Sequence, residues 1–106
     1  MAAYFIFSHK VIDAEKLNNE YLPLSVETLK AYEPEILVVD QNIEFVEGKN
    51  DDTRTVVLKF KDREQANAWY HSEAYQGIVH LRHEATQGRA VLCDEFDPSS
   101  VAPLPA

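Results

Sequence analysis

The chain has 106 residues, 45% of them hydrophobic and 26% charged, which fits one globular domain. Eighteen Asp and Glu residues against ten Lys and Arg residues give a net charge of −8 without any basic run, so nucleic acid and anionic membrane surfaces are poor partners. Cys93 is the single cysteine, and no apolar run approaches the ~20 residues of a membrane span. We therefore expect a cytoplasmic protein without disulfides.

The first third of the chain predicts a strand followed by a helix. Tyr4–Ile12 is rich in the aromatic and β-branched residues that are typical of strands. Asp13 can cap a helix that kinks or breaks at Pro23 and ends at Pro34, because proline donates no backbone hydrogen bond and disfavours a helical residue before it. Apolar residues at helical spacing support this helix: Leu17, Tyr21, Leu24, Val26, Leu29 and Tyr32.

The middle of the chain predicts three short strands. Ile36–Val39 is wholly apolar, Ile43–Glu47 alternates apolar and acidic residues, and Arg54–Phe60 is apolar on both faces in its centre. The short link at residues 40–42 predicts a hairpin or a bulge. Gly48–Asp52 is rich in the residues that favour turns.

The last third predicts two helical segments and a final strand. Asp62 is placed to cap the first segment and Ser72 the second, and Gly88 is expected to end the second. Ala90–Phe96 has the composition of a strand. Asp97–Ala106 contains three prolines, which predicts an extended arm or a disordered tail.

The order of these elements, β-α-β-β-(β)-α-β, predicts a ferredoxin-like α+β domain over residues 1–96, with helices on one face of the sheet. Strands covered on one face should alternate, yet Tyr4–Phe7, Ile36–Val39 and Val56–Leu58 are apolar on both faces. Leaving about six such side chains in water would forgo ~1.5–3 kcal/mol each, which is comparable with the stability of a domain. A second copy of the sheet is the economical cover, so we predict a homodimer.

The combination of motifs resembles the family catalogued as domain of unknown function 1330, within the dimeric α+β barrel group. The resemblance covers most of Ala3 to Glu95. Its carriers are residues at the ends of predicted elements, along the strand Arg54–Phe60 and in the two helical segments after it: Ala3-Tyr4, Asp13, Glu47-Gly48, Arg54, Val56–Phe60, Ala66, Ala68–Tyr70, Ser72, Tyr75 and Arg82.

The resemblance implies a sheet-on-sheet dimer with a pocket between sheet and helices in each subunit. The wider group includes cofactor-independent monooxygenases, lactone isomerases and haem-degrading enzymes, and such an analogy of fold does not determine function. The chain departs from the family at Glu33-Pro34, where members often carry two glycines, and at Lys61, where they often carry proline. The first departure lies beside the expected pocket.

Aromatic and hydroxyl side chains are candidates for a ligand pocket. Tyr21, Trp69 and Tyr75 could line it and offer flat faces to a planar ligand, and Ser72 could orient that ligand. The alternative is that Trp69 and Tyr75 are core anchors and Ser72 caps a helix. His9 shares a strand face with apolar residues and is the candidate catalytic base or hydrogen-bond donor, or else a buried histidine with a structural partner.

Arg54 and Arg82 are candidates for binding the carboxylate of a ligand, because a guanidinium matches a carboxylate with two hydrogen bonds. Surface ion pairs with the abundant Asp and Glu residues are the alternative. The His80–Glu84 segment places two histidines three residues apart, but it lacks the spacing of a zinc hydrolase, so we expect no metal and no cofactor.

Three hypotheses of function follow from these residues. The first is a small dimeric enzyme, monooxygenase-like or isomerase-like, that acts without a cofactor on a small acidic or ring compound. The second is a non-catalytic or stress-related module that binds a metabolite in the same pocket. The third is a purely structural dimer in which the tail is an interaction arm.

Overall fold

The computed structural model describes residues 1–100, so most of the predicted tail, residues 101–106, lies outside the described residues. Regular elements follow one another through the described chain: β1 (Ala3–Val11), α1 (Ala14–Lys16), a π-helical segment (Leu17–Tyr21), α2 (Leu22–Leu29), β2 (Glu35–Asp40), β3 (Arg54–Phe60), α3 (Arg63–Tyr70), α4 (Glu73–Gln76), α5 (Val79–Ala85), β4 (Thr86–Asp94) and a 3₁₀ turn (Pro98–Ser100).

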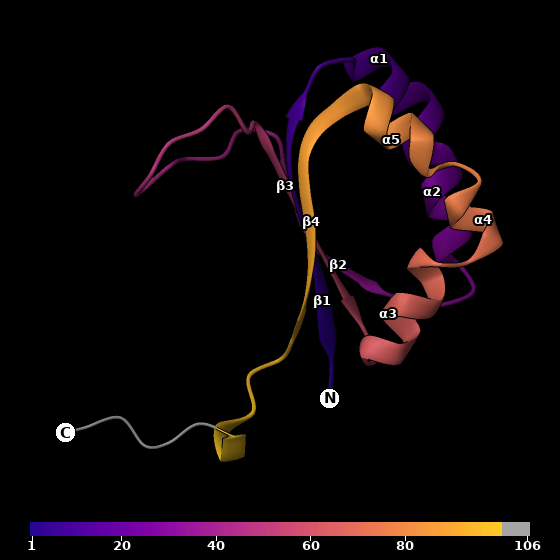
Figure 1. Ribbon diagram of the computed structural model, residues 1–106, viewed down its shortest axis with the longest axis vertical. Helices are drawn as coiled ribbons and strands as arrows, with labels where there is room; N and C mark the ends of the chain where they lie inside the picture. Colours follow the sequence, from indigo (N-terminus) through magenta and orange to yellow (C-terminus); the bar gives the residue numbers. More distant parts are fainter. Residues whose placement is uncertain (101–106) are drawn as a thin grey trace.

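The four strands form one antiparallel sheet in the order β2-β3-β1-β4. All the α-helices lie on one face of this sheet, and no α-helix of residues 1–100 covers the opposite face (Figure 1). The element order and the strand order confirm the predicted ferredoxin-like β-α-β-β-α-β fold. No helix within residues 1–100 is long and apolar enough to cross a membrane.

Strand β1 shows how the sequence places the core. Its side chains alternate, so Ala3, Phe5, Phe7 and His9 are buried beneath the helices while the residues between them are only half-buried. Trp69 of α3 packs its ring edge-on to Phe5, with ring centroids 5.5 Å apart. The face of the sheet towards the helices is therefore the core of the subunit.

The first helix begins where the sequence predicted, because the Asp13 carboxylate accepts a hydrogen bond from the Lys16 N–H (3.0 Å). The chain stays helical through Pro23, and the irregularity lies one turn earlier, in the π-helical segment. Proline has no N–H to donate to the carbonyl of Asn19, four residues before it, so a wider turn is tolerated there. The helix ends at Leu29 rather than at Pro34.

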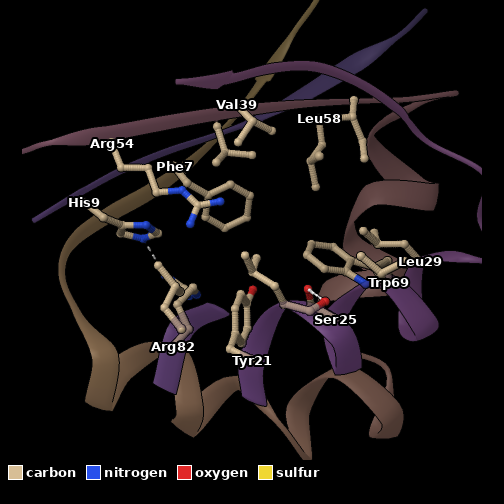
Figure 2. A pocket seen from close by; sticks show the side chains of 15 residues that line it. Phe7, His9, Tyr21, Ser25, Leu29, Val39, Arg54, Leu58, Trp69 and Arg82 are labelled. Atoms are coloured by element: carbon tan, nitrogen blue, oxygen red, sulfur yellow. Dashed lines mark hydrogen bonds between the residues drawn. The ribbon is translucent and has the colours of Figure 1, made fainter. Parts of the chain in front are cut away.

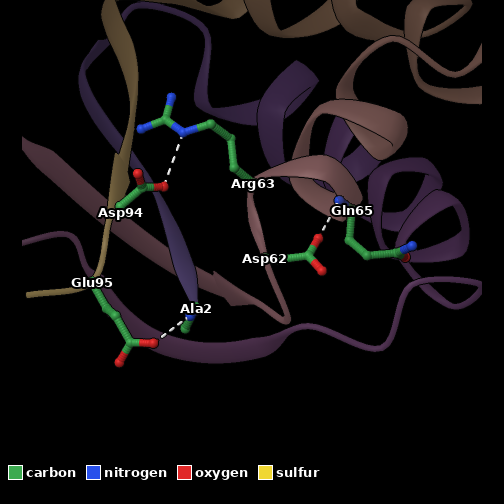
Figure 3. Close-up of polar contacts among 6 residues, drawn as sticks. All are labelled: Ala2, Asp62, Arg63, Gln65, Asp94 and Glu95. Carbon is green, nitrogen blue, oxygen red and sulfur yellow. Dashed lines mark hydrogen bonds and ion pairs between the residues drawn. The ribbon is translucent and has the colours of Figure 1, made fainter. Parts of the chain in front are cut away.

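Two predicted helix caps are present in the second half of the chain. The Asp62 carboxylate accepts from the Gln65 N–H (2.8 Å; Figure 3), and the Ser72 hydroxyl accepts from the Tyr75 N–H (3.2 Å). The same region of Figure 3 shows β1 tied to the end of β4, where the Ala2 N–H donates to the Glu95 carboxylate. The strand neighbours are thus fixed by main-chain pairing and by these end contacts.

Gly88 does not end a helix, as the sequence had suggested, but lies inside β4 opposite His9. The helical segment already ends at Ala85, and the chain turns extended at Thr86. A β-carbon at Gly88 would lie 2.0 Å from the Ser8 carbonyl oxygen, and its φ of 151° is unfavourable for other residues. The glycine is therefore needed for the close approach of β4 to β1.

The prediction of a strand at Ile43–Glu47 is wrong. After Asp40 the chain leaves the sheet, with the Asn42 N–H bonded to the Asp40 carboxylate (2.8 Å), and β3 begins only at Arg54. Alternation of apolar and acidic residues is a local signal, and here no neighbouring strand pairs with the segment. The bulge predicted near residues 40–42 lies inside β2 instead, between Ile36 and Val38.

Candidate functional site

A pocket of about 210 Å³ lies between the sheet and the helical stretch formed by the π-helical segment and α2 (Figure 2). Its walls come from β1, β2 and β3 on one side and from the helices on the other. The lining is mostly apolar and consists of Phe7, His9, Leu17, Tyr21, Leu22, Ser25, Val26, Leu29, Ile36, Val39, Arg54, Val56, Leu58, Trp69 and Arg82. No carboxylate, lysine or thiol is among these residues.

The charged end of the pocket is assembled by strand register and by one helix. His9 of β1 and Arg54 of β3 are directly paired, so both side chains point to the helix face. Arg82 comes from α5 on the opposite side, and Figure 2 shows it meeting His9 across the pocket. All three residues are buried, at 4%, 4% and 6% exposure respectively.

Arg82 is held by neutral groups only. Its Nε donates to the Tyr75 hydroxyl (3.3 Å), and its two terminal nitrogens lie 3.1 Å from His9 Nε2 and 3.4 Å from His83 Nε2. Its guanidinium also lies over the Phe7 ring, 5.3 Å from the centroid, at cation–π distance. The side chain is thus positioned without having its charge neutralised.

Arg54 has no polar partner at all among the described residues. Its Nε is buried and unbonded, and none of the salt bridges within residues 1–100 involves either Arg54 or Arg82. The nearby Asp52 is paired with Arg89 instead (3.4 Å). Burial lowers the pKa of Arg54 from its ordinary value, which is the mark of a desolvated cation.

The hydrogen bond from Arg82 determines the state of His9. Because a guanidinium only donates, His9 Nε2 must accept, and the ring proton of the neutral imidazole sits on Nδ1. Burial, followed by the charges of Arg82 and Arg54, lowers the pKa of His9 to about 4. His9 is therefore a weak proton acceptor near neutral pH, and with Nε2 occupied by Arg82 it has a proton to donate, on Nδ1, but no free nitrogen to act as a base.

Two tyrosines connect the helices behind the charged end. The hydroxyl oxygens of Tyr21 and Tyr75 lie 2.7 Å apart and both side chains are buried. Tyr21 ends the π-helical segment, and both Leu17 and Tyr21 of that segment line the pocket. Burial raises the pKa of both hydroxyls, so both stay protonated at neutral pH.

The other predicted ligand-binding residues divide between the pocket wall and the layer behind it. Trp69 lines the pocket, and its Nε1 donates to the Thr28 hydroxyl (2.9 Å). Tyr75 is fully buried behind Tyr21 and is not part of the wall. Ser72 also lies outside the wall. Its hydroxyl accepts from the Tyr75 N–H at the start of α4 and donates to the Trp69 carbonyl, so both of its hydrogen bonds are to the backbone.

Several wall residues were not predicted to belong to a site. Most of them are apolar side chains of strands and of the first helix, such as Val56, Leu58 and Leu29. Their helical spacing and strand alternation indicated burial, but core and pocket wall have the same sequence pattern. Ser25 gave no signal, and its hydroxyl donates to the Leu22 carbonyl (3.0 Å).

The histidines of α5 do not form a metal site within residues 1–100, where no group of three or more His, Cys, Asp or Glu side chains could hold an ion. His83 contacts Arg82, and Glu84 forms a salt bridge with Lys16 (2.8 Å). These polar groups of α5 therefore form contacts within the protein.

Solved structures with the same fold come from several bacteria. A protein of unknown function from Rhodopseudomonas palustris is 12% identical, with a TM-score of 0.75 over 92% of this chain and 84% of that chain. SnoaB, a cofactor-independent oxygenase from Streptomyces nogalater, is 10% identical, with a TM-score of 0.62 over 91% and 94%. An ethyl tert-butyl ether D (EthD) family protein from Bacillus halodurans is 10% identical, with a TM-score of 0.63 over 91% and 99%.

These identities establish similarity of fold alone. No curated protein matches the sequence. Residues 2–96 match the family described as "Domain of unknown function (DUF1330)", which is nearly the whole chain. The chain therefore belongs to the DUF1330 family, as its sequence motifs had suggested.

Proposed function

We propose that this protein binds a small organic anion in the pocket between sheet and helices. The acidic group of the ligand lies between Arg54 and Arg82, and its apolar body rests on Phe7, Leu58 and Trp69. One observation carries the proposal: two buried guanidinium groups face one pocket, and neither has a carboxylate partner within residues 1–100.

A buried charge without a partner destabilises the folded protein, because no interaction compensates for the hydration that the charge loses. The chain has 18 acidic residues, yet none of those within residues 1–100 forms a salt bridge with either guanidinium group. A ligand carboxylate or another oxyanion would offset this lost hydration energy, since a guanidinium forms two charge-assisted hydrogen bonds with it. The terminal nitrogens of Arg54, which have no hydrogen-bond partner within residues 1–100 and are not buried like its Nε, are the donors that such an acceptor would reach.

The size of the pocket limits the ligand. A volume of about 210 Å³ corresponds to about seven water molecules at ~30 Å³ each. A single ring with a short acidic side chain fits this space. The aromatic wall formed by Phe7 and Trp69 favours a planar body.

A second candidate function is a cofactor-independent enzyme acting on the same class of compound, in line with the oxygenase activity named for SnoaB. Two cationic donors at one end of an apolar pocket favour negative charge that develops on a bound substrate. The weak basicity of His9 argues against proton abstraction by this residue. Such an enzyme would act on a substrate that is already anionic.

We further propose that the protein is a homodimer formed through the sheet face that carries no helix. This face presents Ile6, Val38, Val57 and Val91 around the centre of the sheet, with Val38 and Val91 about 40% exposed. A second sheet would bury these side chains face to face. The pocket lies on the other side of the sheet, so pairing leaves its position within each subunit unchanged.

Trp69 is the only tryptophan, and it lines the pocket, so its fluorescence reports binding directly. We expect phenylacetate to quench it saturably and the neutral phenylacetamide to bind at least tenfold more weakly. Arg54→Met should weaken phenylacetate binding by about a hundredfold, because it removes one partner of a buried charge pair. Arg54→Lys, which keeps the charge, should lie in between.

Arg63→Met is the matched control, because Arg63 is a half-exposed arginine that is paired with Asp94 and lies outside the pocket wall. It should leave the affinity for phenylacetate unchanged. Equal binding of phenylacetate and phenylacetamide, or an unchanged affinity in Arg54→Met, would contradict the proposal.

A further inference from the structure

A chain of three polar groups leads from the anion end of the pocket into its wall. Arg82 Nε lies 3.3 Å from the Tyr75 hydroxyl, which lies 2.7 Å from the Tyr21 hydroxyl. Tyr75 is fully buried, whereas Tyr21 lines the pocket. Figure 2 shows the Tyr21 hydroxyl pointing towards the interior of the pocket, on the same side as Arg82.

The direction of these hydrogen bonds follows from the chemistry of the groups. Arginine only donates, so the Tyr75 oxygen accepts from Arg82. The proton of Tyr75 then needs an acceptor, and within residues 1–100 the Tyr21 oxygen is the one at hydrogen-bond distance. A fully buried hydroxyl is rarely left without an acceptor, so Tyr75 donates to Tyr21.

This direction leaves the Tyr21 proton free for the pocket. Two other neutral donors of the wall are already used: the Ser25 hydroxyl donates to the Leu22 carbonyl and the Trp69 Nε1–H donates to Thr28. The His9 Nδ1–H is a further neutral donor of the wall, on the sheet side of the pocket. Burial raises the pKa of Tyr21, so its hydroxyl keeps its proton at neutral pH. The pocket therefore offers the Tyr21 hydroxyl as an oriented neutral donor on the helix side, beside the two cations.

We propose that the preferred ligand is a 2-oxo acid, whose carboxylate binds Arg54 and Arg82 and whose neighbouring carbonyl oxygen accepts a hydrogen bond from Tyr21. The Tyr21 hydroxyl lies only two hydrogen bonds from the Arg82 guanidinium, which places the second acceptor next to the acidic group. Tyr21 is thus a specificity-determining residue. This inference rests on the proposed binding of an organic anion.

A matched pair of acids tests it. Benzoylformate and phenylacetate differ only in having a carbonyl or a methylene group between ring and carboxylate, and both can be titrated against Trp69 fluorescence or by calorimetry. We expect the protein to prefer benzoylformate by roughly tenfold to a hundredfold, because phenylacetate leaves the Tyr21 donor without an acceptor.

Tyr21→Phe should remove this preference while changing the affinity for phenylacetate by no more than about threefold. Tyr32→Phe is the matched control, because Tyr32 is a half-buried tyrosine outside the pocket wall whose hydroxyl reaches only the Ala68 carbonyl. It should keep the preference. A thermal melt of each variant establishes that it is folded before titration.

The outcomes separate the two proposals. Equal affinity for both acids, or a preference that survives in Tyr21→Phe, would overturn the assignment of Tyr21 and of the 2-oxo acid while leaving anion binding intact. Binding of neither acid would overturn both proposals together. Loss of the preference in Tyr21→Phe alone is the result that supports the inference.

Discussion

The two faces of the sheet differ in what they leave unsatisfied. The face under the helices buries two guanidinium groups that lack any carboxylate partner among the described residues. The opposite face has no helix over it and exposes apolar side chains such as Val38 and Val91. One face lacks negative charge, and the other lacks apolar contact.

This difference indicates two different kinds of partner. A charge deficit inside a pocket of about 210 Å³ is met by a small anion, whereas an apolar surface the size of a sheet is met by another surface. The same strands serve both purposes because alternate residues of a strand point to opposite faces. In β3, Arg54 points to the helices, and Val57 points away from them.

The largest expected effect is on the uncovered face. Val57→Asp would place a charge at the centre of the proposed dimer contact in each subunit, and we expect the dimer to dissociate at least a thousandfold more readily. Analytical ultracentrifugation measures this change. Leu24→Asp, an exposed position on α2, is the control and should leave the assembly unchanged. A Val57→Asp variant that assembles like the parent protein would remove the basis for the dimer.

The second effect is the pH dependence of stability that follows from His9, which lies on the sheet face under the helices. His9 has a pKa of about 4 in the folded protein, lowered by burial and then by Arg82 and Arg54, against 6.5 for the ordinary side chain. The unfolded chain therefore binds the extra proton first as the pH falls, so stability is complete above pH 6.5 and is lost between 6.5 and 4. The loss attributable to His9 approaches roughly 3 kcal/mol.

Urea unfolding of the parent protein and of His9→Gln at pH 7 and at pH 4.5 isolates this contribution. The free energy of unfolding should fall more steeply for the parent protein over that interval. Parallel pH profiles for the two proteins would show that the environment of His9 is not as described.

The third effect is an increase in stability. Arg54→Met replaces an unpaired buried cation by an apolar side chain of similar length, and we expect the free energy of unfolding without ligand to rise by about 2 kcal/mol. Thermal denaturation of the unliganded protein measures it. A decrease would mean that Arg54 contributes to stability through contacts of its own and is not kept for a ligand.

The smallest effect lies at the turn after α2, which borders the pocket although neither Glu33 nor Pro34 belongs to its wall. Glu33 is exposed and has a φ of 47°, in the left-handed region that glycine adopts readily. Its N–H bonds the Leu29 carbonyl (3.1 Å) and closes the helix, so Glu33→Gly should raise the free energy of unfolding by about 0.5–1 kcal/mol. Anion affinity should not change. A measurable loss of stability would contradict this account of the turn.

Much of the fold could be predicted because its signals are local. The apolar, β-branched centre of Arg54–Phe60 predicted a strand with the bounds that β3 has, and the caps at Asp62 and Ser72 predicted two helix starts. The wrong predictions concern segments whose structure depends on contacts with residues that are distant in the sequence. Gly88 is typical of a helix end in sequence, but its role is the close approach to Ser8, and Ile43–Glu47 alternates without a strand beside it.

The candidate site could be predicted by residue type more than by position. His9 was proposed as an imidazole on an apolar strand face, and Arg54 and Arg82 as guanidinium groups that match a carboxylate; the structure brings all three together around one pocket. Ser72 and Tyr75 were proposed for their hydroxyl and aromatic groups, but they lie outside its wall. The role of Tyr21 depends on a hydrogen bond to a residue 54 positions later in the chain, which no local pattern contains.

A crystal structure of the protein grown with phenylacetate would locate the anion directly. We expect the carboxylate between the guanidinium groups of Arg54 and Arg82, with the phenyl ring against Phe7 and Trp69. An aspartate or glutamate of the protein itself bound to Arg54, or a ligand whose carboxylate faces the mouth of the pocket, would contradict anion binding at this site.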